Sequence, residues 1–268
     1  MVEIFQNIRE IYDFQKPCEA LADFVEFFAE SSPIASGQYF TKGHAHSKMF
    51  ASWTPTFYIN LGSPYSIDLD NTRYSIGADD DILILRNGDV TRHLLPTDRL
   101  FTVKFYPGGL EAVLGISQAV LIDRVVKLNE ILPPLLLTQI KQAACFEERV
   151  IIVQAFLLGS QFGHRKKDHY LKIVQDAIGE YNTSGMQLNT SELAERLFVT
   201  SKSINRYFHK VVGISPKAYF SILRTRAALS AFVQNREDFD PWIFGYCDHS
   251  HFCKDVARFT GQRLSDQQ

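Results

Sequence analysis

A set of polar and basic side chains recurs along one face of a predicted helix near the carboxyl end of the chain. They are Lys202, Asn205, Arg206 and His209, and apolar residues occupy the opposite face. Lysine and arginine can donate hydrogen bonds to guanine O6 and N7, and asparagine can pair with adenine N6 and N7. Recognition of base edges in a duplex is therefore the chemistry that this face could perform, although amphipathic helices with other roles are common.

Signals for a shorter helix and a tight turn precede this helix. Asn189 and Glu192 have the spacing of a capping box at the start of the short helix, which covers 193–198, and Thr200 can cap the longer helix. A short helix, a tight turn and an amphipathic helix form the helix-turn-helix plan. The sequence thus predicts one such motif over about 190–213.

The same pattern occurs again 48 residues further on. Residues 204–213 align without a gap on 252–261, with apolar opposite apolar, basic opposite basic, and a glycine at the end of each. Between the copies, Ser215 and Pro216 can start a helix that runs to about Val233. Such a helix, roughly 27 Å long, could hold two recognition helices about one DNA turn apart, near the ~34 Å between successive major-groove entries.

Four stretches of this region together resemble the DNA-binding domain of the AraC/XylS family of bacterial transcription regulators. They are residues 213–216, 224–231, 245–252 and 258–261, and the resemblance covers about 170–261. It implies base-edge contacts from two recognition helices, the second within a motif over about 239–261. The implied contact residues are Lys202, Ser203, Asn205 and Arg206 in the first helix, and His249, Ser250, Cys253 and Lys254 in the second.

Three features depart from the family's pattern. Pro241 lies inside the segment before the second recognition helix, and Val256 stands where the family usually has phenylalanine. The proline and closing helix that the family has near 263–265 are missing. We therefore expect the second motif to be looser, and the first to be the main reader of the DNA sequence.

The amino-terminal half has short runs of aromatic and β-branched residues separated by turn signals, which are typical of strands. The runs are 57–61, 65–69, 81–85 and 100–106. They predict a β-barrel or sandwich over about 38–106, with a tight hairpin turn at the Asn-Gly pair 87–88 and a helix at 18–28. Many AraC/XylS regulators carry a cupin-like sensor, and segments 60–62 and 104–110 resemble one uncharacterised variety of it, which implies no particular ligand.

After Gly109 the pattern changes to helical periodicity, and no further strand is expected. The predicted helices cover 110–114, 131–145 and 146–162. Apolar residues surround most of the helix at 150–157, which indicates burial between domains or at a dimer interface.

Charge divides the chain into two parts. Residues 1–163 carry 13 Lys and Arg against 19 Asp and Glu, whereas 164–268 carry 15 against 11, although the whole chain has a net charge of only −2. We predict a sensor and dimerisation region at 1–163, with helices at about 110–162, and a DNA-binding domain at 164–268. The charged run 163–169 would link them. The expected fold class is α+β: a cupin-like β-barrel with flanking helices, then an all-α domain with two helix-turn-helix motifs joined by a long helix.

Two patterns of histidine and cysteine could bind a metal ion instead. One is Cys247, His249, His251 and Cys253, and the other is His44 with His46. On a helix only His249 and Cys253 of the first pattern share a face. The second pattern lacks a nearby glutamate, since the next acidic residue is Asp68. We expect no metal ion and no cofactor.

Enzyme motifs are not found: the sequence has no nucleophile elbow, P-loop, dinucleotide fingerprint or carboxylate pair. The alternative hypothesis is a cupin-type metal-binding protein or enzyme with a helical appendage. Residues that could line a barrel cavity, with plain core as the competing interpretation, are Trp53, Tyr58, Asn60, Arg86 and His93.

The sequence has no apolar stretch long enough to cross a bilayer, no secretory signal pattern and only four scattered cysteines. We therefore expect a cytoplasmic transcription regulator with no membrane partner, and both activation and repression stay open. The expected partners are double-stranded DNA, a small-molecule effector, RNA polymerase and a second copy of the chain.

Overall fold

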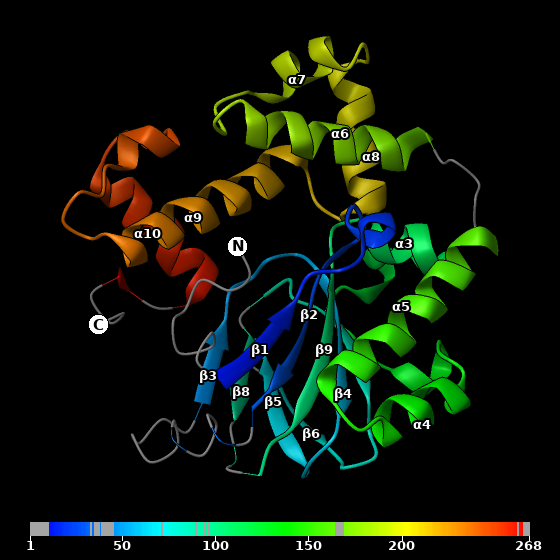
Figure 1. The fold of residues 1–268 in the computed structure, drawn as a ribbon. Helices are drawn as coiled ribbons and strands as arrows, with labels where there is room; N and C mark the ends of the chain where they lie inside the picture. The colour runs from blue at the N-terminus through cyan, green and yellow to red at the C-terminus, as the bar shows by residue number, and fades with distance from the viewer. Residues whose placement is uncertain are drawn as a thin grey trace.

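The structure, a computed structural model, describes residues 11–32, 34, 38, 46–70, 72–88, 90–93, 95, 97–163, 169–261 and 263–264. An antiparallel β region comes first and helices follow, so the fold class is α+β (Figure 1). Most of the predicted linker, residues 164–168, lies outside the described residues, as does His44.

The strands of the described residues form two antiparallel sheets. The first has the order β1 (Tyr12–Gln15), β2 (Val25–Ser31), β9 (Leu100–Phe105), β4 (Pro55–Asn60), β7 (Ile82–Leu85) and β10 (Val125–Lys127). The second has the order β3 (His46–Met49), β8 (Val90–His93), β5 (Tyr65–Leu69) and β6 (Thr72–Ile76). An antiparallel β region is therefore confirmed. The pairings between described strands keep the two sheets distinct, and they do not close into one barrel.

The β region is built in layers around a first sheet that is buried on both faces. In β4, Phe57 belongs to one hydrophobic cluster and Tyr58 to another, as the alternation of a pleated strand requires. The Tyr58 cluster includes residues of both sheets. The Phe57 cluster includes the helices that cover the first sheet, and these are α3 (Gly109–Leu114), α4 (Pro134–Gln142) and α5 (Phe146–Gly163) (Figure 1).

The helix predicted for 18–28 is wrong. A single 3-10 turn, η1 (Glu19–Leu21), is followed by strand β2, which pairs with β1 on one side and β9 on the other. A strand that is covered on both faces carries apolar residues without alternation, so the apolar residues of β2 also matched a helical spacing. The pairing partners, which lie far away in the sequence, decided the structure.

The hairpin predicted at 87–88 is also wrong, because β7 and β8 lie in different sheets. The Asn-Gly pair instead carries the chain from one sheet to the other, and Asn87 donates a hydrogen bond of 2.7 Å to Asp123. One short strand, β10, follows Gly109 and pairs with β7, contrary to the expectation that strands would not return.

The carboxyl-terminal helices enclose a second hydrophobic core, which Phe50 of the amino-terminal half also enters. They are α6 (His169–Thr183), α7 (Thr190–Arg196), α8 (Ser201–Val211), α9 (Pro216–Gln234), the 3-10 turn η4 (Pro241–Phe244) and α10 (His249–Thr260). Phe208 of α8, Phe220 of α9 and Phe252 of α10 are all buried in this core. Within the described residues, no helix has the length and the apolar content that crossing a membrane requires.

Candidate nucleic-acid interface

The first helix-turn-helix is built by local hydrogen bonds. The Asn189 side chain accepts from the N–H groups of Ser191 and Glu192, and the Glu192 carboxylate accepts from the Asn189 N–H, so the predicted capping box is present. Thr200 caps α8 by accepting from the N–H of Ser203 at 3.1 Å. These caps satisfy donors that a helix leaves unpaired, and they fix where α7 and α8 begin.

Helix α8 has one buried face and one polar face. Ile204, Phe208 and Val211 are fully buried, as the amphipathic pattern predicts. The four polar residues opposite them are exposed: Lys202, Asn205, Arg206 and His209. The Arg206 guanidinium lies 5.0 Å from the centroid of the Tyr207 ring. Ser203 is half-buried and its hydroxyl is 2.9 Å from that of Thr200, which places it at the cap.

Helix α10 repeats this design. Asp248 caps it by accepting from the His251 N–H at 2.7 Å. The exposed residues at the start of the helix are His249, Ser250 and Lys254. Both α8 and α10 end at a glycine with positive φ, 93° for Gly213 and 65° for Gly261, as a helix C-cap prefers.

The paired cysteine and histidine of α10 share a face, as predicted. Cys253 Sγ lies 3.3 Å from His249 Nδ1. Burial raises the pKa of the Cys253 thiol above its ordinary value. In the part of the chain that the structure describes, no three His, Cys, Asp or Glu residues are grouped to hold a metal ion. His46 lies in β3.

The element before α10 differs from the one before α8. It is the single 3-10 turn η4, capped by Asp240, which accepts from the Trp242 N–H at 2.9 Å. Val256 of α10 is nevertheless fully buried. Phenylalanines gather at the same helix, and the centroids of Phe239 and Phe252 are 4.7 Å apart. Aromatic side chains thus fill the core of the second motif, although its first helix is reduced to a turn.

Helix α9 joins the two motifs and packs along α10. It has 19 residues and is therefore about 28 Å long. Asp255 pairs with Arg224 at 3.3 Å, and the ring of His249 lies 6.5 Å from that of Phe232. The earlier residue of α9, Arg224, contacts the later residue of α10, Asp255, and the order is reversed for Phe232 and His249. The two helices are therefore antiparallel, and the end of α10 approaches the first half of α9.

The five residues proposed to line a barrel cavity lie in three different surroundings. Tyr58 is buried between the sheets and donates to Met49 Sδ at 3.2 Å, and the buried Asn60 amide donates to two backbone carbonyls. Trp53 and Arg86 meet through a backbone hydrogen bond of 2.8 Å at the edge of the helical region. His93 lies 2.7 Å from Asp68 Oδ2 in the second sheet, where hydrogen bonds from Arg73 and His93 hold the pKa of Asp68 well below its usual range.

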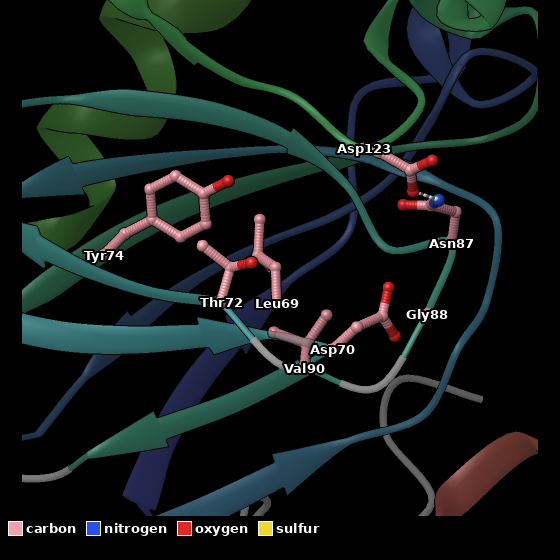
Figure 2. Close-up of a pocket in the computed structure, with 8 residues that line it drawn as sticks. All are labelled: Leu69, Asp70, Thr72, Tyr74, Asn87, Gly88, Val90 and Asp123. Carbon is pink, nitrogen blue, oxygen red and sulfur yellow. Dashed lines mark hydrogen bonds between the residues drawn. The ribbon is translucent and has the colours of Figure 1, made fainter.

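A pocket of about 110 Å³ opens at the β5–β6 turn, and Figure 2 shows its lining. The residues around it are Leu69, Asp70, Thr72, Tyr74, Asn87, Gly88, Val90 and Asp123. A β-carbon on Gly88 would lie 2.2 Å from Asp70 Oδ1, so any larger residue there would displace the Asp70 carboxylate. None of the five predicted cavity residues contributes to this pocket.

Phe198, in the turn between α7 and α8, is 97% exposed and has a φ of 55°. A side chain in the left-handed region costs about 1 kcal/mol or more, and glycine avoids that cost. Phe198→Gly is therefore expected to raise the free energy of unfolding by up to about 1 kcal/mol, measured by urea denaturation. Phe198→Ala is the matched control, since it removes the ring but keeps the strain. A gain with alanine equal to that with glycine would contradict this account.

Sequence reasoning missed two buried polar residues, and the first of them joins the two halves of the molecule. Gln118 and Lys104 are both 1% exposed and both contact groups far away in the sequence. The available signal was a long polar side chain within each mainly apolar run, Gln118 in 114–122 and Lys104 in 100–106. A buried polar group must find a partner, but the sequence does not say which.

The fold and the candidate interface together define a chain in which an antiparallel β region is followed by the helix pair α7 and α8 and by a second capped helix, α10, which α9 joins to α8. No family model matches the sequence, and no curated protein matches it. The structure is similar to that of ToxT from Vibrio cholerae, with a TM-score of 0.48 and 9% identity over 83% of this chain and 97% of ToxT. ToxT with bound unsaturated fatty acid gives a TM-score of 0.46 and 12% identity over 83% and 88%. The AraC-like transcriptional activator CuxR gives a TM-score of 0.31 and 12% identity over 90% and 93%.

Proposed function

We propose that this protein is a sequence-specific DNA-binding regulator of transcription, of the AraC type that its motifs resemble. The observation that carries the proposal is the pair of capped helices, α8 and α10, each of which buries an apolar face and exposes a polar face. Such helices fit the major groove, where Arg, Lys and Asn side chains can reach base edges. The net positive charge of residues 164–268 favours contact with phosphates.

In this proposal residues 164–268 bind DNA and residues 1–163 regulate them. The β region would act as a cupin-like sensor for a small molecule, and the bound regulator would act on RNA polymerase in the cytoplasm. Helix α8 would make the main contacts with the DNA sequence, because a regular helix, α7, precedes it, whereas only the 3-10 turn η4 precedes α10. The contact residues proposed for α10 are His249, Ser250, Cys253 and Lys254.

The regulator is proposed to be a homodimer joined through α4 and α5. Leu135 of α4 is 69% exposed and Ile151 of α5 is 64% exposed, so each helix presents an apolar side chain that a second copy would remove from water. Ile151→Glu is therefore expected to convert a dimer into a monomer, because it would bury a charge at the interface. Sedimentation equilibrium measures the mass, with the exposed Lys172→Glu as control. A wild-type mass of one chain at working concentration would contradict the dimer.

Arg206→Ala is expected to weaken binding to a selected duplex by about 1 to 3 kcal/mol and to relax the base preference at one position. Lys202→Ala is expected to add to this loss. Binding is measured by fluorescence anisotropy at one fixed salt concentration, since salt alone changes affinity strongly. The matched control is Arg73→Ala, which removes an exposed arginine from the β region. Unchanged binding by the double variant at α8 would contradict the proposed function.

A further inference from the structure

The carboxyl-terminal ends of α8 and α10 both lie against one short segment of the amino-terminal half. The segment is residues 50–53, between β3 and β4, and is called the connector. The Trp53 N–H donates to the Arg86 carbonyl at 2.8 Å, and Ser52 Oγ lies 2.6 Å from Thr54 Oγ1. The connector is thus fixed to the β region on one side, while its other side faces the helices.

At the end of α10, the connector enters the core of the carboxyl-terminal helices. The Ala51 N–H donates to the Phe259 carbonyl at 3.2 Å. Phe50 is 1% exposed, belongs to the same hydrophobic cluster as Phe208 and Phe252, and has its ring centroid 6.1 Å from that of Phe259. A phenylalanine of the amino-terminal half therefore completes the core beneath α10.

At the end of α8, one buried amide joins the connector to the helix. Gln118, in the 3-10 turn η2 (Gln118–Leu121), donates from Nε2 to the Trp53 carbonyl at 3.2 Å and to the Val212 carbonyl at 3.0 Å. The neighbouring Ser117 hydroxyl donates to the Lys210 carbonyl at 3.3 Å. Carbonyls at a helix end lack partners within the helix, and here the amino-terminal half supplies them.

Backbone conformation shows how firmly the connector is held. Trp53 has a φ of 52°, in the left-handed region that a tryptophan rarely adopts. Such a conformation persists where the surrounding contacts determine it. Trp53 packs against both the helical core and the core of the β region, and a β-carbon on Gly213 would lie 3.5 Å from its ring.

We propose that the connector fixes the distance and angle between α8 and α10, and so determines the spacing of the two DNA segments that they contact. The proposal rests on the function proposed above. Helix α9 packs against α8 and α10 in one shared core. The connector adds a second attachment that closes a ring through α8, α9, α10 and the β region. Two linked binding modules gain affinity only where their geometry matches the target, and a rigid arrangement lowers the cost of ordering them.

The test measures how binding of the full chain depends on the spacing between the two contact segments of a duplex. Wild-type protein first selects a parent site from random-sequence DNA, and one base pair is then inserted between its two protected segments. The insertion moves one segment by about 3.4 Å and turns it by roughly 35°. Wild type is expected to lose about tenfold or more in affinity, the order of magnitude that one mismatched pair costs. For the Phe50→Ala and Trp53→Gly variants, the same insertion is expected to lower the affinity by less than about threefold.

Two choices separate positioning from simple destabilisation. Glycine at position 53 can keep a φ of 52°, so Trp53→Gly removes the ring without disturbing the backbone. Phe28→Ala removes a buried ring from the β region that belongs to a different cluster from Phe50, and it should keep the spacing dependence of wild type.

Four results would overturn the proposal. The connector variants could lose as much affinity on insertion of one base pair as wild type does. Phe28→Ala could also reduce that loss as much as the connector variants do. Folded connector variants could lose affinity equally for every spacing. Failure of wild-type protein to select any duplex would instead contradict the proposed function, and the inference with it.

Discussion

Replacing Glu26 by alanine is expected to lower the free energy of unfolding by about 3 to 5 kcal/mol. Glu26 in β2 lies between two cations: its Oε1 is 2.6 Å from Arg226 of α9, and its Oε2 is 3.3 Å from Lys104 of β9. The side chains of Glu26 and Lys104 are 7% and 1% exposed, and that of Arg226 is 16% exposed. Alanine would leave the buried Lys104 ammonium and the half-buried Arg226 guanidinium without their shared carboxylate, which costs far more than a surface ion pair contributes.

Glu26→Ala should weaken the packing of the first sheet against α9 as well as lower global stability, because Arg226 belongs to the helix that joins the two motifs. Thermal and urea unfolding measure it, with the exposed Glu237→Ala as control, expected to change stability by less than about 0.5 kcal/mol. Replacing Glu26, Lys104 and Arg226 together by apolar residues of similar size should restore most of the stability. A loss below about 1 kcal/mol for Glu26→Ala would contradict the buried charge cluster.

Phe208→Ala is expected to cost about 3 to 5 kcal/mol, since it would leave a cavity in the core behind the polar face of α8. The Phe208 side chain is fully buried, and its ring centroid is 5.2 Å from that of Phe220 and 6.1 Å from that of Tyr219. The corresponding residue of the second motif is Val256, also fully buried. Val256→Ala removes a smaller group and should cost about 2 kcal/mol.

Urea denaturation followed by helical circular dichroism measures both variants. Phe198→Ala is the control here as well, because it removes an aromatic ring that is 97% exposed. Equal losses for Phe208→Ala and Val256→Ala would show that the second motif depends on its valine as strongly as the first depends on its phenylalanine. That result would contradict the description of aromatic side chains filling the second core around Val256.

The carboxyl-terminal half was largely predictable because its signals are local. The Asn189–Glu192 capping box and the Thr200 and Ser215 caps each act within three residues of their own position, and all are present as predicted. The repeat ending at Gly213 and Gly261 fixed the positions of α8 and α10. Short-range hydrogen bonds and helical periodicity need no knowledge of the rest of the fold.

The β region was less predictable because strands depend on partners that are distant in the sequence. Segment 18–28 has apolar residues at helical spacing, yet residues 25–31 form a central strand covered on both faces. The pair 87–88 has the composition of a hairpin turn, yet it connects two sheets. The connector was missed for the same reason, since nothing near Phe50 in the sequence shows that its ring packs against Phe259.

We propose that the chain binds duplex DNA through two helices, α8 and α10, that enter successive major grooves. The most direct test is a footprint of wild-type protein on a duplex selected from random-sequence DNA, together with its affinity for that duplex and for a scrambled one at equal salt. Two protected major-groove segments about 10 base pairs apart are expected, with binding at least about 10³-fold tighter to the selected duplex. Equal affinity for the two duplexes, or protection of a single segment, would contradict it.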